Sequence, residues 1–135
     1  MKPFIPKEWV RMRKQPEGAL LGYVRERGTY WFKGDKRSSI ELKAPYSPGE
    51  VCWVREAIYY NVQHDNFYYV SNHKGCGDAV YHKLRKNVAC RQTLKYSPAV
   101  MPEIAARRHV RILSCVPEQR GEWGWKIEWE ESDAL

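Results

Sequence analysis

Apolar and polar residues alternate most regularly near the C-terminal end of the sequence. In EWGWKIEWE, residues 122–130, Trp123, Trp125, Ile127 and Trp129 occupy every second position. Side chains point alternately to the two faces of a strand, so these four share one face and the charged residues share the other. The segment predicts a strand whose Trp-rich face packs in the core, with stacking of nucleic-acid bases on that face as the alternative.

A second strand is predicted over GEVCWVREAIYY, residues 49–60, which is mostly apolar on both faces. Strands of that kind are usually central in a sheet or barrel. Arg55 and Glu56 nevertheless stand in its middle, where an ionised group is costly unless it is paired or lines a cleft. The pattern therefore predicts partners for both residues. A further strand over NFYYV, residues 66–70, is expected to form a hairpin with it.

Shorter patterns complete the prediction of strands. LLGYVRERGTYWF, residues 20–32, indicates two extended pieces around Gly28, and RHVRILSCV, residues 108–116, alternates like a strand. Many short strands joined by turns favour an α+β class that is mainly β, and a chain of 135 residues fits a single domain, residues 1–135.

Little helix is expected. EWVRMRKQ, residues 8–15, predicts one short helix, and Pro102 suits the first turn of another over residues 102–107. Residues 71–95 keep no regular period of 2 or 3.6 and contain many basic side chains. They predict a long basic loop, and long loops in compact domains are often functional.

Charge is distributed unevenly along the chain, which has a net charge of +7. Residues 1–40 hold ten Lys and Arg against four acids, residues 74–95 hold six against one, and the last twenty residues are acidic. A basic surface interleaved with Tyr and Trp suits a polyanion such as nucleic acid. A basic protein without such a ligand is the alternative.

The cysteines and the apolar stretches bound the environment. The four cysteines are widely spaced, the N-terminal segment has no apolar region of a signal peptide, and no stretch approaches the ~20 apolar residues of a membrane span. We expect a reduced, cytoplasmic protein with no membrane partner and no cofactor. Two histidines and two cysteines, His73, Cys76, His82 and Cys90, superficially resemble a zinc knuckle. Their spacing matches no standard knuckle, so we expect ordinary loop residues and keep a zinc site as the alternative.

Two motifs carry a family resemblance. YSPGEVCWVREA, residues 46–57, is followed by SPAVMPEIAARRHVRI, residues 97–112, and then by a strand of the form W-x-I-x-[FW]-E. Together they resemble the ASCH group of PUA-like domains, especially the short phage-encoded members, over residues 44–130. The resemblance implies a PUA-like pseudo-barrel with one or two short flanking helices and a cleft that binds RNA. A β-sandwich with converged motifs is the alternative fold.

The resemblance also implies a site. Arg107 matches the Arg of the family's A-S-R pattern, although Ala106 replaces the Ser, and it should pair with Glu56. Arg55 would then face solvent or an anionic ligand, and whether Glu56 is structural or faces the ligand stays open. These three residues, Arg55, Glu56 and Arg107, would form the floor of the cleft, and a nucleotide bound there could stack on Tyr59 or Tyr96. The basic residues expected to hold its backbone are Lys83, Arg85, Lys86 and Arg91.

Three functions are weighed. We expect a non-enzymatic module of phage or prophage origin that binds RNA or single-stranded nucleic acid. Relatives of this fold that hydrolyse acylated cytidine imply an alternative in which Lys36 is the amine, Ser39 the hydroxyl and Glu56 the proton-transferring carboxylate. A third reading is an inhibitor that binds a host protein through the basic loop.

Overall fold

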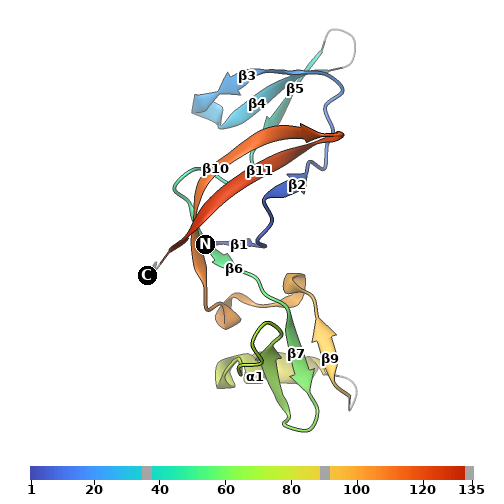
Figure 1. Cartoon of the computed structure of the whole chain (residues 1–135), viewed down its shortest axis with the longest axis vertical. Helices are drawn as coiled ribbons and strands as arrows, with labels where there is room; N and C mark the ends of the chain where they lie inside the picture. Colours follow the sequence, from blue (N-terminus) through green and yellow to red (C-terminus); the bar gives the residue numbers. More distant parts are fainter. Residues whose placement is uncertain (35–37, 89–91, 133–135) are drawn as a thin grey trace. The chain divides into compact units, whose positions relative to one another are not determined.

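The computed structural model describes residues 1–34, 38–88 and 92–132 (Figure 1). The chain divides into two compact units. Unit 1 comprises Met1–Pro6 and Cys52–His109, and unit 2 comprises Lys7–Val51 and Val110–Ser132. Each unit is therefore built from two separate stretches of the chain.

Unit 2 contains a three-stranded antiparallel sheet in the order β3-β4-β5, formed by β3 (Leu20–Val24), β4 (Thr29–Lys33) and β5 (Ser39–Lys43). The 3-10 helix η1 (Arg25–Arg27) joins the first two strands and ends at Gly28, whose φ of 61° lies in the left-handed region that glycine adopts readily. The two extended pieces predicted around Gly28 are confirmed.

A long hairpin forms the rest of unit 2. β10 (His109–Arg120) turns at Gly121 into β11 (Glu122–Ser132), and the short β2 (Trp9–Arg11) pairs antiparallel with the other edge of β11. Trp125 and Ile127 are buried and Trp123 and Trp129 are half-buried, so the predicted packing of the Trp-rich face is confirmed.

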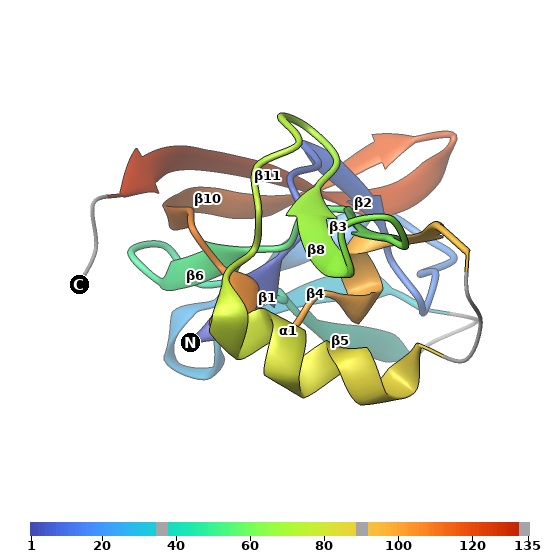
Figure 2. The ribbon, with the colours of Figure 1, turned by 90° about the horizontal axis from the view of Figure 1, so that it is seen from below.

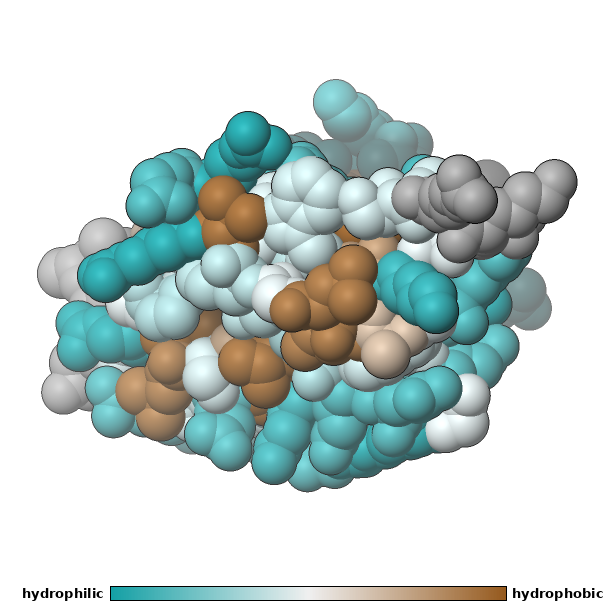
Figure 3. Space-filling view, turned by 90° about the horizontal axis from the view of Figure 1, so that it is seen from above, coloured by the Kyte–Doolittle hydropathy of each residue, from teal (hydrophilic) through white to brown (hydrophobic). Residues whose placement is uncertain are grey.

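Aromatic contacts connect β11 with β4 in unit 2. The Trp123 ring meets the buried Phe32 ring edge-on at 5.0 Å between centroids, and the Trp125 ring lies 5.7 Å from Tyr30. Large exposed apolar residues also occur in this unit, such as Leu21. On the face shown in Figure 3, the apolar side chains form separate patches between hydrophilic ones.

Unit 1 begins with a parallel pair of strands, β1 (Lys2–Phe4) and β6 (Val51–Val54). The first residue of β6, Val51, is counted with unit 2. Phe4 lies opposite Val54, and both are buried. The Val54 amide donates to the Arg108 carbonyl at 2.9 Å. This bond brings the residue that precedes β10 beside the end of β6.

The second part of unit 1 is a three-stranded antiparallel sheet in the order β8-β7-β9, made of β7 (Ile58–Asn61), β8 (Asn66–Tyr69) and β9 (Leu94–Tyr96). The predicted hairpin of β7 and β8 is confirmed. α1 (Asp78–Leu84) contacts β8 (Figure 2). The 3-10 helices of this unit are η2 (Arg85–Asn87), η3 (Pro98–Val100) and η4 (Glu103–Ala105), and both η2 and η4 contact α1.

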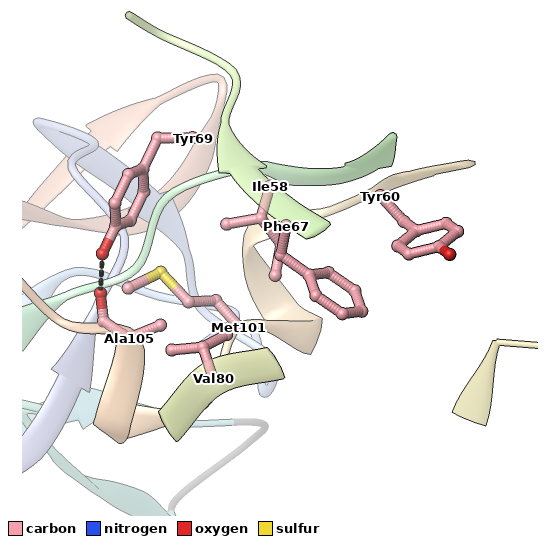
Figure 4. Close-up of a cluster of buried hydrophobic side chains, with 7 residues drawn as sticks. All are labelled: Ile58, Tyr60, Phe67, Tyr69, Val80, Met101 and Ala105. Carbon is pink, nitrogen blue, oxygen red and sulfur yellow. Dashed lines mark hydrogen bonds between the residues drawn. The ribbon is translucent and has the colours of Figure 1, made fainter. Parts of the chain in front are cut away.

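One face of this sheet packs into a buried cluster (Figure 4). Figure 4 shows Met101 between Tyr69 and Val80, the buried residue of α1. The cluster consists of Ile58, Tyr60, Phe67, Tyr69, Val80, Met101 and Ala105.

Four predictions about these elements are corrected by the structure. The strand over 49–60 breaks at residues 55–57, where the chain leaves β6 and enters another sheet. The helix over 8–15 is absent, because β2 pairs there with β11 and the Met12 amide then donates to Trp123 O at 3.0 Å. The loop over 71–95 contains α1, η2 and β9 instead. The expected helix over 102–107 is reduced to η4.

The α+β, mainly β class is confirmed: within the ranges that the structure describes, strands dominate and α1 is the one α-helix. The PUA-like pseudo-barrel remains a prediction. Over the same residues, the structure contains no helix with the length and apolar composition needed to cross a membrane.

Candidate functional site

The site is built around Glu56, which lies in the break between β6 and β7 in unit 1. The Arg55 amide donates to Phe4 O at 2.8 Å, and the Glu56 amide lies 3.0 Å from the sulfur of buried Met101. The Glu56 side chain keeps 11% of its exposure. The break therefore places an acid at the edge of the core.

Arg107 binds this carboxylate through a bidentate pair of hydrogen bonds, called the fork below. Its Nη2 donates to Glu56 Oε1 at 2.8 Å and its Nε donates to Oε2 at 2.9 Å. The predicted ion pair of Glu56 and Arg107 is confirmed. Two parallel bonds fix the angle as well as the distance between the groups, so the carboxylate is held in one orientation.

The rest of the guanidinium is also engaged. Nη1 donates to Asn72 Oδ1 at 3.1 Å, Nη2 donates to Ser71 Oγ at 2.9 Å, and the Arg107 Cζ lies 3.7 Å from the centre of the Tyr69 ring. Tyr69 in turn donates from its hydroxyl to Ala105 O at 2.5 Å (Figure 4). The hydrogen bonds to Glu56 raise the pKa of Arg107 above its ordinary value. Arg107 is thus a fixed part of the site.

Sequence reasoning missed the partners of Arg107. Ser71 and Asn72 follow β8 after one residue, Val70, and two polar residues after an apolar strand were the signal that could have found them. Tyr69 gives no such signal, because its alternation in the strand predicts only burial.

A hollow opens beside the pair, within unit 1, with a volume of about 390 Å³. The Arg55 Cζ lies 5.2 Å from the centre of the Trp53 ring, and its Nε is buried without a hydrogen-bond partner. Arg55 forms no ion pair in the part of the chain that the structure describes. The hollow is lined by Ile5, Pro6, Arg55, Glu56, Ala57, Val70, Ser71 and Pro98.

The two tyrosines predicted to stack on a base at this floor do not line the hollow. Tyr59 lies on β7 with its ring stacked 5.6 Å from Tyr68, and Tyr96 lies on β9 with its ring 6.4 Å from Phe67. The predicted floor therefore keeps Arg55, Glu56 and Arg107 together but lacks the aromatic residues.

The basic residues divide into two groups. Lys83 and Lys86 are exposed on α1 and η2. Arg85 instead pairs with Asp65 at 2.8 Å and lies over the Tyr60 ring, 5.6 Å from its centre. Arg91 lies outside the described residues. Arg85 therefore ties the segment after α1 to the hairpin.

Asp65 is the centre of that tie. Its carboxylate accepts hydrogen bonds from the hydroxyls of Tyr60 and Tyr81 as well as from Arg85. These bonds, the one from Tyr60 first, lower the pKa of Asp65 below its ordinary value. The carboxylate thus joins β7, α1 and η2.

The alternative zinc set is not assembled in the described ranges. There, no group of three or more His, Cys, Asp or Glu could hold a metal ion, and Cys90 lies outside them. His73 Nδ1 hydrogen-bonds the Tyr59 hydroxyl at 3.0 Å, and the His82 ring lies against Tyr81. Burial raises the pKa of the Cys76 thiol to about 11, so at neutral pH it stays protonated.

The described members of the alternative catalytic set belong to different units. Ser39 begins β5 in unit 2, whereas Glu56 belongs to unit 1, and Lys36 lies outside the described residues. Both oxygens of Glu56 already accept bonds from Arg107.

Comparisons with known proteins gave no match among protein-family models, curated proteins or solved structures. The resemblance to the ASCH group therefore rests on the sequence motifs, and the function must be argued from the site.

Proposed function

We propose that the protein is a nucleic-acid-binding module that takes RNA or single-stranded nucleic acid at the hollow beside Glu56. The observation that carries this proposal is the state of Arg55. Among the described residues, its charge has no ionic partner and its buried Nε has no acceptor. A buried donor without a partner costs about 1–3 kcal/mol, which an acceptor on a bound ligand would recover.

The residues around Arg55 supply complementary groups. Glu56 offers carboxylate oxygens that Arg107 holds in place, and Ser71 adds a hydroxyl at the wall of the same hollow. A base edge carries both donors and acceptors, so a fixed acceptor beside a guanidinium can pair with both kinds of group. The floor is thus suited to discriminate between bases.

The remaining features agree with this proposal. Lys83 and Lys86 are exposed cations that can contact phosphates without regard to sequence. A PUA-like domain of the ASCH group, of phage or prophage origin, is the fold and source that we propose. We also propose the cytoplasm as its compartment, since Cys52, Cys76 and Cys115 are free thiols.

Fluorescence anisotropy with labelled single-stranded RNA, single-stranded DNA and duplex tests the proposal. The matched variants are Arg55→Gln and Arg25→Gln, each of which removes one positive charge; Arg25 is an exposed residue of unit 2. We expect Arg55→Gln to weaken single-strand binding about tenfold, because it removes a contact made inside the site. Arg25→Gln should change it less than about twofold.

Two results would overturn the proposal. In the first, no oligonucleotide binds at low salt. In the second, the two variants weaken binding equally, which would make the attraction a property of overall charge rather than of the hollow. Incubation with acylated cytidine, followed by chromatography, tests the amidohydrolase; turnover that is lost in Lys36→Ala would replace our proposal.

A further inference from the structure

The β8-β7-β9 sheet has a second face that the hollow does not use. Ile58 and Tyr60 point into the buried cluster, so Tyr59, which stands between them on β7, points to the opposite face. Tyr68 lies directly across from Tyr59 on β8, and their rings stack at 5.6 Å between centroids with 26° between planes. We call this face the aromatic face; both tyrosines are half-buried on it.

The two tyrosines belong to a row that crosses the sheet. On one side of Tyr59 the register places Lys95 of β9, and on the other side of Tyr68 an antiparallel bridge places Gly75. Residues paired across antiparallel strands point to the same face. The row therefore runs Lys95, Tyr59, Tyr68, Gly75, with an exposed residue at each end.

Gly75 leaves an opening at the end of the row. A Cβ at this position would meet Asn66 Nδ2 at 3.9 Å and Tyr68 Cε1 at 4.0 Å, which is ordinary van der Waals contact. The space that a side chain would fill beside the Tyr68 ring is therefore open. We call this opening over Gly75, which the Tyr68 ring bounds on one side, the slot; a flat ring can lie in it against Tyr68.

Two histidines contact the tyrosine rings. His73 Nδ1 bonds the Tyr59 hydroxyl at 3.0 Å, and its ring lies edge-on to Tyr59 at 5.7 Å. The His64 ring lies edge-on to Tyr68 at 6.3 Å. Aromatic side chains that are already oriented lose little rotamer entropy when a ligand stacks on them.

The charges near this face select the class of ligand. Lys95 extends the row with a cation. The acid of the hairpin turn, Asp65, is occupied by Tyr60, Tyr81 and Arg85. Ordered aromatic rings beside a cation match a nucleic-acid strand, whose bases stack and whose phosphates are anionic.

We propose that the aromatic face is a second contact surface for a single-stranded nucleic acid, with one unpaired base stacked on Tyr68 in the slot over Gly75 and a phosphate near Lys95. This inference rests on the proposed function and adds how the strand is held outside the hollow.

The test places a side chain in the slot and measures the effect on binding. Gly75→Val needs no unusual backbone angle and places a branched side chain in the opening, while Gly22→Val, in β3, has no atom within 4 Å of the added Cβ and serves as the matched control. Binding of a labelled ten-nucleotide poly-A strand should weaken about tenfold in Gly75→Val, because a stacked base contributes about 1–3 kcal/mol. Gly22→Val should bind like the parent protein.

Two further measurements isolate stacking. Tyr68→Leu should weaken binding as Gly75→Val does, while Tyr68→Phe should retain it, since a ring without the hydroxyl still stacks. An abasic strand of equal length keeps the phosphates but lacks the bases, so Gly75→Val should leave its affinity unchanged. Circular dichroism and melting curves show that each variant is folded.

The outcomes separate this inference from the proposed function. If Arg55→Gln weakens binding but Gly75→Val and Tyr68→Leu do not, the hollow binds and the aromatic face does not. Equal loss for the abasic strand would mean a backbone contact and would also overturn stacking. If Tyr68→Leu instead abolishes self-association in sedimentation, the face is a protein interface. If no strand binds at all, the proposed function itself fails.

Discussion

The ring of Trp9 lies directly over Gly124. β2 pairs with β11 so that Trp9 stands opposite Lys126, and its indole reaches along β11 to cover the glycine. A Cβ on Gly124 would overlap the ring. The indole Nε1 donates to Glu118 O at 3.2 Å, which holds the ring in this position.

We expect Gly124→Ala to destabilise unit 2 by about 1–3 kcal/mol, because either the indole or a strand must shift to admit the methyl group. The control is Gly22→Ala, where the added Cβ meets no atom within 4 Å. Urea unfolding followed by Trp fluorescence measures both. Equal stability of the two variants would show that the indole moves away at no cost.

The fork of Arg107 on Glu56 predicts a graded loss of stability. Glu56→Gln leaves a charged, partly buried guanidinium without its counter-ion and should lower the free energy of unfolding by about 2–4 kcal/mol. Arg107→Lys keeps the charge but loses the fork and the contact with Tyr69, and should cost about 1–2 kcal/mol. Urea titration provides the measurement.

The exposed pair of Arg27 and Glu41, at 2.7 Å, is the control for this series. Glu41→Gln should change stability by less than about 1 kcal/mol, since exposed pairs contribute little. A cost for Glu56→Gln no larger than that for Glu41→Gln would mean that the fork does not hold unit 1 together.

Asp65 predicts how unit 1 responds to acid. Its pKa is lower in the folded chain than the ordinary value of 3.8, mainly through the hydrogen bond from Tyr60. A lowered pKa means that the carboxylate stabilises the fold above the unfolded pKa, and that this contribution is lost as pH falls through the folded pKa. We expect the melting temperature to fall below about pH 4 and Asp65→Asn to flatten that fall.

Circular dichroism melts between about pH 7 and pH 2 measure this effect, since carboxylates titrate over that range. Glu26→Gln, which changes an exposed acid in η1, is the control. If the melting temperature of Asp65→Asn falls with pH as that of the control does, Asp65 does not contribute to the loss of stability in acid.

Cys76 should resist alkylation. Its thiol has a pKa raised to about 11 by burial, so little thiolate is present near pH 8. With iodoacetamide at about pH 8, we expect modification of Cys76 to be at least about tenfold slower in the folded chain than in urea. Peptide mapping by mass spectrometry identifies the modified residue, and equal rates in both states would contradict the burial.

The fold could be predicted from the sequence where one strand stays in one sheet. β11 has one buried face and alternates accordingly. Residues 49–60 differ, because β6 pairs with β1 and β7 pairs with β8 and β9. Apolar residues continue across the junction, so the pattern shows no break; the charges of Arg55 and Glu56 were its only sign.

Helices were predicted least well, for two physical reasons. α1 spans Asp78–Leu84, and Val80 is its buried residue. Such a short helix cannot establish a period of 3.6 in the sequence. Residues 8–15 are rich in helix formers, but β2 gains ladder bonds by pairing with β11, and tertiary pairing overrides a weak local preference.

The candidate site could be predicted only in part. The pair of Glu56 and Arg107 followed from two sequence motifs, through the family resemblance that they suggest. Tyr69, Ser71 and Asn72 approach Arg107 from more than thirty positions earlier in the chain. Two polar residues after an apolar strand mark Ser71 and Asn72 as candidates, but no local pattern identifies Arg107 as their partner. The aromatic face depends on the register of β7 with β8 and of Tyr68 with Gly75, which no local pattern specifies.

The parallel pairing of β1 with β6 has a consequence for synthesis on the ribosome. Phe4 emerges early, but its partner Val54 follows about 50 residues later, so the nascent β1 must stay unpaired while the intervening segment is made. Because residues 7–51 and 110–132 together form unit 2, neither unit can be completed before the later half of the chain has left the exit tunnel. Both units thus depend on contacts between distant stretches of the chain, and a chaperone that shields the waiting apolar strand should raise the yield of native protein.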